Sequence, residues 1–165
     1  MKRALIIGCP GGGKSTFAKA LHQAVRLPLY HLDLLFWKSD ATCESKAVFL
    51  QKMEEILKKD RWIIDGNYQS TMERRMEFCD TIFFLDYSLE TCLDGIAQRH
   101  GKPRDDLPWI EQHEDPEFLQ FIRNFETEKR PQILALLENY KGKEIHIFHN
   151  RKEADLFIEG LKKEM

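Results

Sequence analysis

The chain has 165 residues, and its 25 Lys and Arg nearly balance its 27 Asp and Glu, which leaves a net charge of −2. This length predicts a single domain spanning residues 1–165, and the balanced charge disfavours binding to nucleic acid or to anionic lipid. Leu, Ile, Val and Phe make up about 27% of the residues, enough for a sizeable core. No apolar run approaches the roughly 18 residues of a membrane span.

The predicted elements alternate between strands and helices along the whole chain. In chain order they are a strand at 4–7, a helix at 15–26, a strand at 29–32, a helix at 46–58, a strand at 62–64, a strand at 81–85, a helix at 89–100, a polar loop at 101–116, a helix at 117–140 interrupted at Pro131, a strand at 145–148 and a helix at 151–163. Asn150 and Glu153 form a capping box at the start of the last helix. This alternation predicts a three-layer α/β/α fold with a five-stranded parallel sheet and a ligand site at the carboxyl ends of its strands.

The N-terminal segment and the cysteines indicate where the protein works. The apolar run after Lys2 and Arg3 is shorter than the roughly 7 residues that a secretory signal requires. The four cysteines are widely spaced and include no C-x-x-C pair, so they suggest neither a zinc site nor a disulfide framework. We therefore expect a cytoplasmic protein with reduced thiols.

A phosphate-binding loop lies between the first predicted strand and the first predicted helix. The run Gly8-Cys9-Pro10-Gly11-Gly12-Gly13-Lys14-Ser15 fits the pattern G-x-x-x-x-G-K-[ST]. Glycines let backbone N–H groups converge on phosphate oxygens, and the following helix directs its positive end at the same anion. The expected nucleotide ligands are Gly8, Gly11, Gly12, Gly13, Lys14, Ser15 and Thr16. Lys14 would reach the β and γ phosphates, and Ser15 would ligate Mg²⁺.

Three acids stand at or just after the ends of predicted strands. Asp65 follows an apolar run and precedes Gly66, which is typical of the carboxylate that holds the metal through water, although a turn or helix cap would use the same residue. Asp33 ends the second strand and is the better base or ligand of an acceptor. Asp86 is favoured as a capping or structural residue.

Several of these segments resemble one bacterial family. The loop from Gly8 to Thr16, the run His31-Leu32-Asp33-x-x-x-Trp37 and the run Asp65-Gly66-Asn67-Tyr68 resemble the bacterial topology modulation proteins, which are adenylate-kinase-like P-loop proteins. The resemblance covers essentially the whole chain and implies ATP and Mg²⁺ as cofactors, with a fold similar to nucleoside monophosphate, shikimate and gluconate kinases. The family name implies an influence on DNA topology, but a name or a fold does not establish a mechanism.

The acceptor side departs from the adenylate-kinase pattern. Gln69 stands where that pattern has an arginine after the third strand, and Phe36 stands where it has a second phosphate-binding arginine. Without these guanidinium clamps a monophosphate acceptor is disfavoured, unless Arg74 or Arg75 compensates. An acceptor hydroxyl on a smaller molecule fits better.

The acceptor pocket and the lid complete the candidate site. The predicted acceptor-binding residues are Asp33, Trp37, Asn67 and Tyr68, although the two aromatic residues would serve equally well in the core. Arg99 ends the helix at 89–100, where similar kinases carry a lid arginine, and Arg104 follows in a short lid over about 100–116. Both arginines are candidates to stabilise the transferring phosphoryl group, and a cation at a helix C-terminus is the alternative for Arg99.

These observations predict an Mg²⁺-dependent ATP-binding phosphotransferase that acts on a small-molecule acceptor. The predicted catalytic residues are Lys14, Asp33, Arg99 and Arg104, and the predicted metal-binding residues are Ser15 and Asp65. One alternative is a nucleotide-dependent regulatory or DNA-associated protein, in which ATP controls shape without phosphorylating an acceptor. Another is a nucleoside monophosphate kinase that works despite Gln69 and Phe36.

Overall fold

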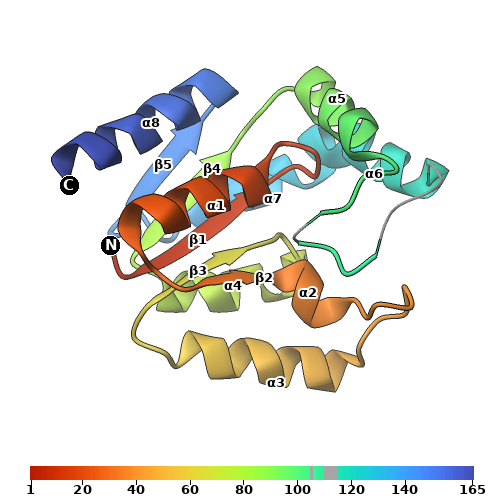
Figure 1. The fold of residues 1–165 in the computed structure, drawn as a ribbon, viewed down its shortest axis with the longest axis horizontal. Helices are drawn as coiled ribbons and strands as arrows, with labels where there is room; N and C mark the ends of the chain where they lie inside the picture. Colours follow the sequence, from red (N-terminus) through yellow and green to blue (C-terminus); the bar gives the residue numbers. More distant parts are fainter. Residues whose placement is uncertain (105, 110–114) are drawn as a thin grey trace.

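A five-stranded parallel sheet lies at the centre of the molecule (Figure 1). The structure is a computed structural model, and it describes residues 1–104, 106–109 and 115–165. The strands are β1 (Arg3–Gly8), β2 (Leu29–His31), β3 (Trp62–Asp65), β4 (Thr81–Leu85) and β5 (Glu144–Phe148), in the spatial order β2-β3-β1-β4-β5. The predicted fold class is confirmed, and all five predicted strands are present.

Helices cover both faces of the sheet. They are α1 (Lys14–Val25), α2 (Leu32–Phe36), α3 (Lys46–Leu57), α4 (Gln69–Phe78), α5 (Leu89–Arg99), α6 (Pro116–Glu128), α7 (Arg130–Glu138) and α8 (Arg151–Glu164). In Figure 1, α1 and α8 lie in front of the sheet, whereas α4 and α7 lie behind it. Within the described residues, no helix has the length and apolarity that crossing a membrane demands.

The core is continuous through the sheet. The central strands β1 and β4 bury their whole apolar runs, including Ile6, Phe83 and Phe84 at 0% exposure. The aromatic ring of Phe17 from α1 lies 5.1 Å from the ring of Phe83. A near-continuous apolar run is what a parallel strand needs when helices cover both of its faces.

Several predicted boundaries are confirmed. The helix expected at 117–140 is interrupted as predicted, because α6 ends at Glu128 and α7 begins at Arg130, with Pro131 in its first turn. Asn150 caps α8 by accepting a hydrogen bond from the N–H of Glu153 at 3.0 Å.

Other boundaries differ from the prediction. The second strand stops at His31, and Leu32 starts the short helix α2, so Asp33 lies in a helical first turn and not at a strand end. Helix α4 was not predicted. The lid expected over about 100–116 is described only in part, since 105 and 110–114 lie outside the described residues.

Candidate functional site

The phosphate-binding loop follows β1 and runs directly into α1, as predicted. Gly11 and Gly13 have φ angles of 82° and 85°, a left-handed backbone that favours glycine. A Cβ on Gly11 would also lie 2.1 Å from the carbonyl oxygen of Cys92 in α5, so a side chain does not fit there. Gly13 is the N-cap of α1 and offers no side chain to its first-turn N–H groups, which leaves their positive end to a ligand.

The side chain of Lys14 folds back onto the backbone of the phosphate-binding loop. Its side chain is half-buried, and Nζ donates to the carbonyl oxygen of Cys9 at 3.3 Å. Burial lowers the pKa of Lys14, while the carboxylates of Asp65 and Asp33 act in the opposite direction and Arg99 adds to the lowering. Arg99 is the last residue of α5, and its role beside the phosphates stays a prediction.

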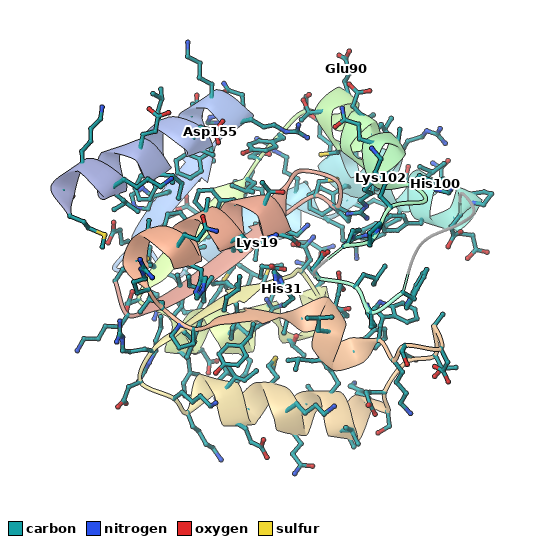
Figure 2. The ribbon with its side chains drawn as sticks, viewed as in Figure 1. Lys19, His31, Glu90, His100, Lys102 and Asp155 are labelled. Atoms are coloured by element: carbon teal, nitrogen blue, oxygen red, sulfur yellow. The ribbon has the colours of Figure 1, made fainter. Side chains whose placement is uncertain are left out.

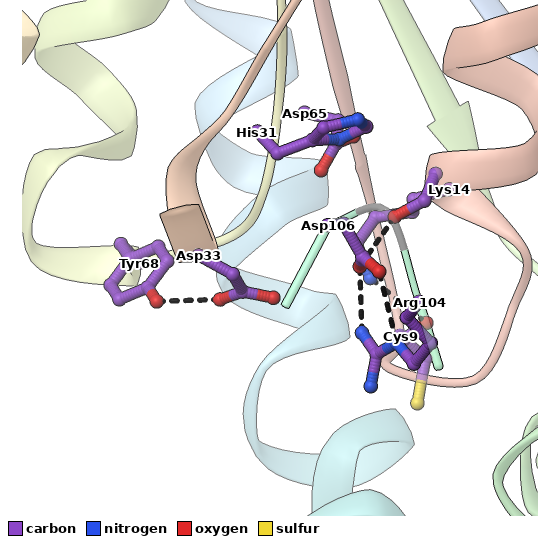
Figure 3. A network of polar contacts seen from close by, with 9 residues as sticks. Cys9, Lys14, His31, Asp33, Asp65, Tyr68, Arg104 and Asp106 are labelled. Atoms are coloured by element: carbon purple, nitrogen blue, oxygen red, sulfur yellow. Dashed lines mark hydrogen bonds and ion pairs between the residues drawn. The ribbon is translucent and has the colours of Figure 1, made fainter. Parts of the chain in front are cut away.

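Ser15 contacts a lid residue that the sequence did not single out. Its Oγ donates to Oδ2 of Asp106 at 2.6 Å, and Arg104 donates to both oxygens of the same carboxylate, at 2.9 Å from Nε and 2.6 Å from Nη2 (Figure 3). Asp106 is buried, with an exposed fraction of only 6%. Burial disfavours the ionised carboxylate, yet the bonds from Arg104 and Ser15 outweigh it and hold the pKa of Asp106 far below its usual range.

Asp65 and His31 form a second polar pair. They end neighbouring strands, and His31 of β2 is in register with Asp65 of β3. Nδ1 of His31 bonds to Oδ2 of Asp65. Figure 2 labels His31 near the centre of the view. Burial alone would lower the pKa of His31, but the bond to Asp65 and its charge raise it. The histidine thus orients the predicted metal-binding carboxylate.

Asp33 and Tyr68 form the third pair, on the acceptor side (Figure 3). Tyr68 Oη donates to Oδ1 of Asp33 at 2.6 Å. Burial raises the pKa of Asp33, and the bond from Tyr68 offsets only part of that rise. A carboxylate with a raised pKa is a better proton acceptor than an ordinary aspartate.

Aromatic side chains surround Tyr68. Phe36 and Phe49 have ring centroids 5.2 Å and 5.1 Å from its ring, and Trp37 packs edge-on against Phe36 at 5.1 Å. Trp37 also meets Trp109 of the lid at 6.0 Å. Tyr68 and Trp37 therefore belong to one aromatic cluster beside Asp33, and their contact with an acceptor stays a prediction.

Three further residues named in the sequence analysis have the following contacts or exposure in the structure. The amide of Asn67 forms two hydrogen bonds with the backbone of Gly8 in the phosphate-binding loop, and acceptor binding by Asn67 stays a prediction. Thr16 is exposed in the first turn of α1. Asp86 forms a bidentate ion pair with Arg130, at 2.8 Å and 2.9 Å, which agrees with its expected structural role.

Neither arginine of α4 can replace the missing phosphate clamps in this arrangement. Arg74 binds Glu54 at 2.8 Å and Glu77 at 3.1 Å on the surface. Arg75 is fully buried and donates to backbone carbonyls. Gln69 and Phe36 thus leave the acceptor side without the guanidinium pair that the adenylate-kinase pattern would supply.

Comparison with known proteins supports the fold. The chain is 31% identical over 118 residues to the adenylate kinase of Thermosipho africanus (strain TCF52B), a match that includes 67% of this chain and 54% of that protein. The chain therefore spans about half the length of the curated relative it matches. No family model matches the sequence, so the resemblance to topology modulation proteins stays a prediction.

Solved shikimate kinases share the architecture. That of Bacteroides thetaiotaomicron superposes with a TM-score of 0.64 at 18% identity, covering 99% of this chain and 97% of the other. That of Acinetobacter baumannii, in complex with shikimate, superposes with a TM-score of 0.66 at 12% identity, covering 99% and 94%. The chain has a P-loop kinase-like fold.

Proposed function

We propose that this protein is an ATP-dependent phosphotransferase that phosphorylates a hydroxyl group of a small molecule bearing no phosphate. The observation that carries the proposal is the grouping of Lys14 and Ser15 with Asp65 and Asp33 at one edge of the sheet. Ligands of open α/β sheets bind at this edge, where the strand order reverses. In this sheet the order reverses at β1, which lies between β3 and β4.

The donor half of the proposed site suits Mg·ATP. The loop provides backbone N–H groups and a half-buried ammonium, and Ser15 and Asp65 provide the oxygen donors that Mg²⁺ prefers. When bound, Mg·ATP would supply the γ-phosphoryl group, which forms a new P–O bond to the acceptor as its bond to the β,γ-bridging oxygen breaks and ADP leaves. Arg99 and Arg104 would offset the negative charge on the transferring group.

The acceptor half suits a neutral hydroxyl compound. Asp33 would accept the proton of the acceptor hydroxyl, because burial raises the pKa of this carboxyl and Tyr68 fixes one of its oxygens. The carboxylate charge of Asp33 would disfavour an anionic acceptor, and the aromatic cluster at Tyr68 and Trp37 would contact the apolar parts of the acceptor.

Transfer of the labelled γ-phosphate of ATP to a pooled panel tests this proposal. The panel contains nucleosides, nucleoside monophosphates, sugars and hydroxy acids, and the variants are Lys14→Ala and Asp33→Asn, with the exposed Asp40→Asn as the matched control. We expect label on an uncharged hydroxyl compound with the wild type and the control, and none with the other two variants. Label on a monophosphate would instead support the nucleotide-kinase alternative.

Binding of Mg·ATP without transfer to any compound would contradict the proposed reaction. That result, together with slow hydrolysis unaffected by Asp33→Asn, would favour the regulatory alternative.

A further inference from the structure

The loop between β3 and α4 connects the two halves of the proposed site. Asn67 Oδ1 accepts a hydrogen bond from the N–H of Gly8 at 3.0 Å, and its Nδ2 donates to the carbonyl oxygen of Gly8. The next residue, Tyr68, donates its hydroxyl to Asp33. One loop therefore touches both the start of the phosphate-binding loop and the proposed base.

The backbone of this loop adopts conformations that side chains rarely allow. Gly66 has a φ of 136°, and a Cβ there would lie 2.8 Å from Cβ of Leu32. Tyr68 has a φ of 37° although it carries a bulky side chain. Such conformations cost free energy and persist only where surrounding contacts hold them.

A buried arginine supplies those contacts. The guanidinium of Arg75 has no exposed surface; Nη1 donates to the carbonyl oxygen of Gly66 at 2.8 Å, and Nη2 donates to those of Asn67 and Tyr68, the latter at 3.2 Å. Within the described residues, no carboxylate forms an ion pair with Arg75. Burial of a cation without an anionic partner is costly, because the carbonyls replace only part of its hydration.

We infer that Arg75 is a positioning residue, which fixes the loop at 66–68 so that Asn67 holds Gly8 in the geometry required for binding Mg·ATP. The inference rests on the nucleotide site of the proposed function. Its chemistry needs a guanidinium, because one planar fork must reach three consecutive carbonyl oxygens. An apolar side chain of similar volume would fill the space but would leave those carbonyls without donors.

The test compares Arg75→Met, Asn67→Ala and the double variant by calorimetric titration with a nonhydrolysable ATP analogue in Mg²⁺. Arg74→Met is the matched control, since Arg74 is the neighbouring arginine but lies exposed on Glu54 and Glu77. We expect each single variant to bind the analogue about tenfold more weakly, and the double variant to bind no more weakly than the weaker single variant. Arg74→Met should bind as the wild type does.

A purely structural role for Arg75 predicts a different result. Arg75→Met would then lower the melting temperature but leave the dissociation constant of the folded protein unchanged. Alternatively, Arg75→Met and Asn67→Ala would weaken binding independently, so that their two factors multiply in the double variant. Either result overturns the inference. Arg75→Lys adds a check by partial rescue, because an ammonium can reach one carbonyl but cannot span three, so its affinity should lie between those of Arg75→Met and the wild type.

Asn67→Ala keeps the experiment decisive if Arg75→Met does not fold. Alanine removes both hydrogen bonds to Gly8 without adding a charge beside the phosphates, so wild-type affinity of Asn67→Ala would overturn the inference. Failure of the folded wild type to bind the analogue would instead contradict the proposed function itself.

Discussion

Replacement of Asp106 by asparagine should tighten the binding of Mg·ATP. The Asp106 carboxylate accepts the hydroxyl of Ser15 at 2.6 Å and is itself held by Arg104. Ser15 is the proposed metal ligand, and we expect its hydroxyl to turn away from Asp106 when its oxygen faces Mg²⁺. The lid carboxylate therefore competes with the nucleotide complex for Ser15.

The size of the effect follows from the bond that must break. A hydrogen bond to a charged group contributes about 1.5–3 kcal/mol, and one between neutral groups about 0.5–1.5 kcal/mol. The asparagine side chain of the variant would keep a neutral bond to Ser15, so the difference is about 1–1.5 kcal/mol, which corresponds to about 5- to 13-fold tighter binding. Loss of a negative charge near the phosphates, and release of Arg104, act in the same direction.

Calorimetric titration with a nonhydrolysable ATP analogue measures this change. Titrations with Mg²⁺ and with a chelator separate the contribution of the metal, and Asp94→Asn, an exposed acid on α5, is the matched control. The reasoning would be refuted if the Asp106→Asn variant bound the analogue more weakly than the wild type in Mg²⁺ but not in the chelator. That result would mean that this carboxylate assists binding of the ion and does not compete with it.

Two further predictions concern the contact between α5 and the phosphate-binding loop and the response of the fold to acid. Gly95→Ala should lower stability by about 1–2 kcal/mol and weaken nucleotide binding, because overpacking outweighs the gain of about 1 kcal/mol in helix propensity. A Cβ on Gly95 would lie 2.0 Å from the carbonyl oxygen of Gly11, whereas a Cβ on Gly160 of α8 would have no atom within 4 Å. Thermal unfolding should therefore show a higher stability for the control Gly160→Ala than for the wild type. Equal effects of the two substitutions would contradict this explanation. Burial disfavours ionised Asp80, but bonds from a hydroxyl and two backbone N–H groups outweigh it and lower its pKa. Its stabilisation, about 1 kcal/mol after solvent screening, is therefore complete above the unfolded-state pKa of about 4 and is lost as the pH falls through the lower folded-state value. Denaturant unfolding of Asp80→Asn should show a deficit at pH 7 that shrinks toward about pH 2, and a deficit independent of pH would exclude the carboxylate as its cause.

The sequence by itself determined the architecture and the place of the phosphate-binding loop in the candidate site. The glycine pattern from Gly8 to Ser15 and the five apolar runs are local signals, because strand burial and loop conformation depend on neighbouring residues. Pro131 marked the break between α6 and α7 through a local rule as well, since proline fits the first turn of α7 but has no N–H to donate back into α6.

Helix α4 was missed because its buried face does not look apolar. That face carries Thr71, Met72, Arg75 and Met76, so a polar residue and a cation stand where a helical pattern would place leucines. The periodicity used to find helices assumes that buried positions are hydrophobic, and it fails where a helix buries a charge to hold a neighbouring loop.

Only the tertiary structure decided which polar groups meet. Asp106 reaches Ser15 across 91 positions of sequence, and Asn67 reaches Gly8 across 59. Each of these residue types is ordinary on a protein surface, and nothing in its immediate neighbours indicates burial. Their roles arise because parallel strands bring their carboxyl ends together, so that loops distant in sequence must satisfy one another's hydrogen bonds at a single edge of the sheet.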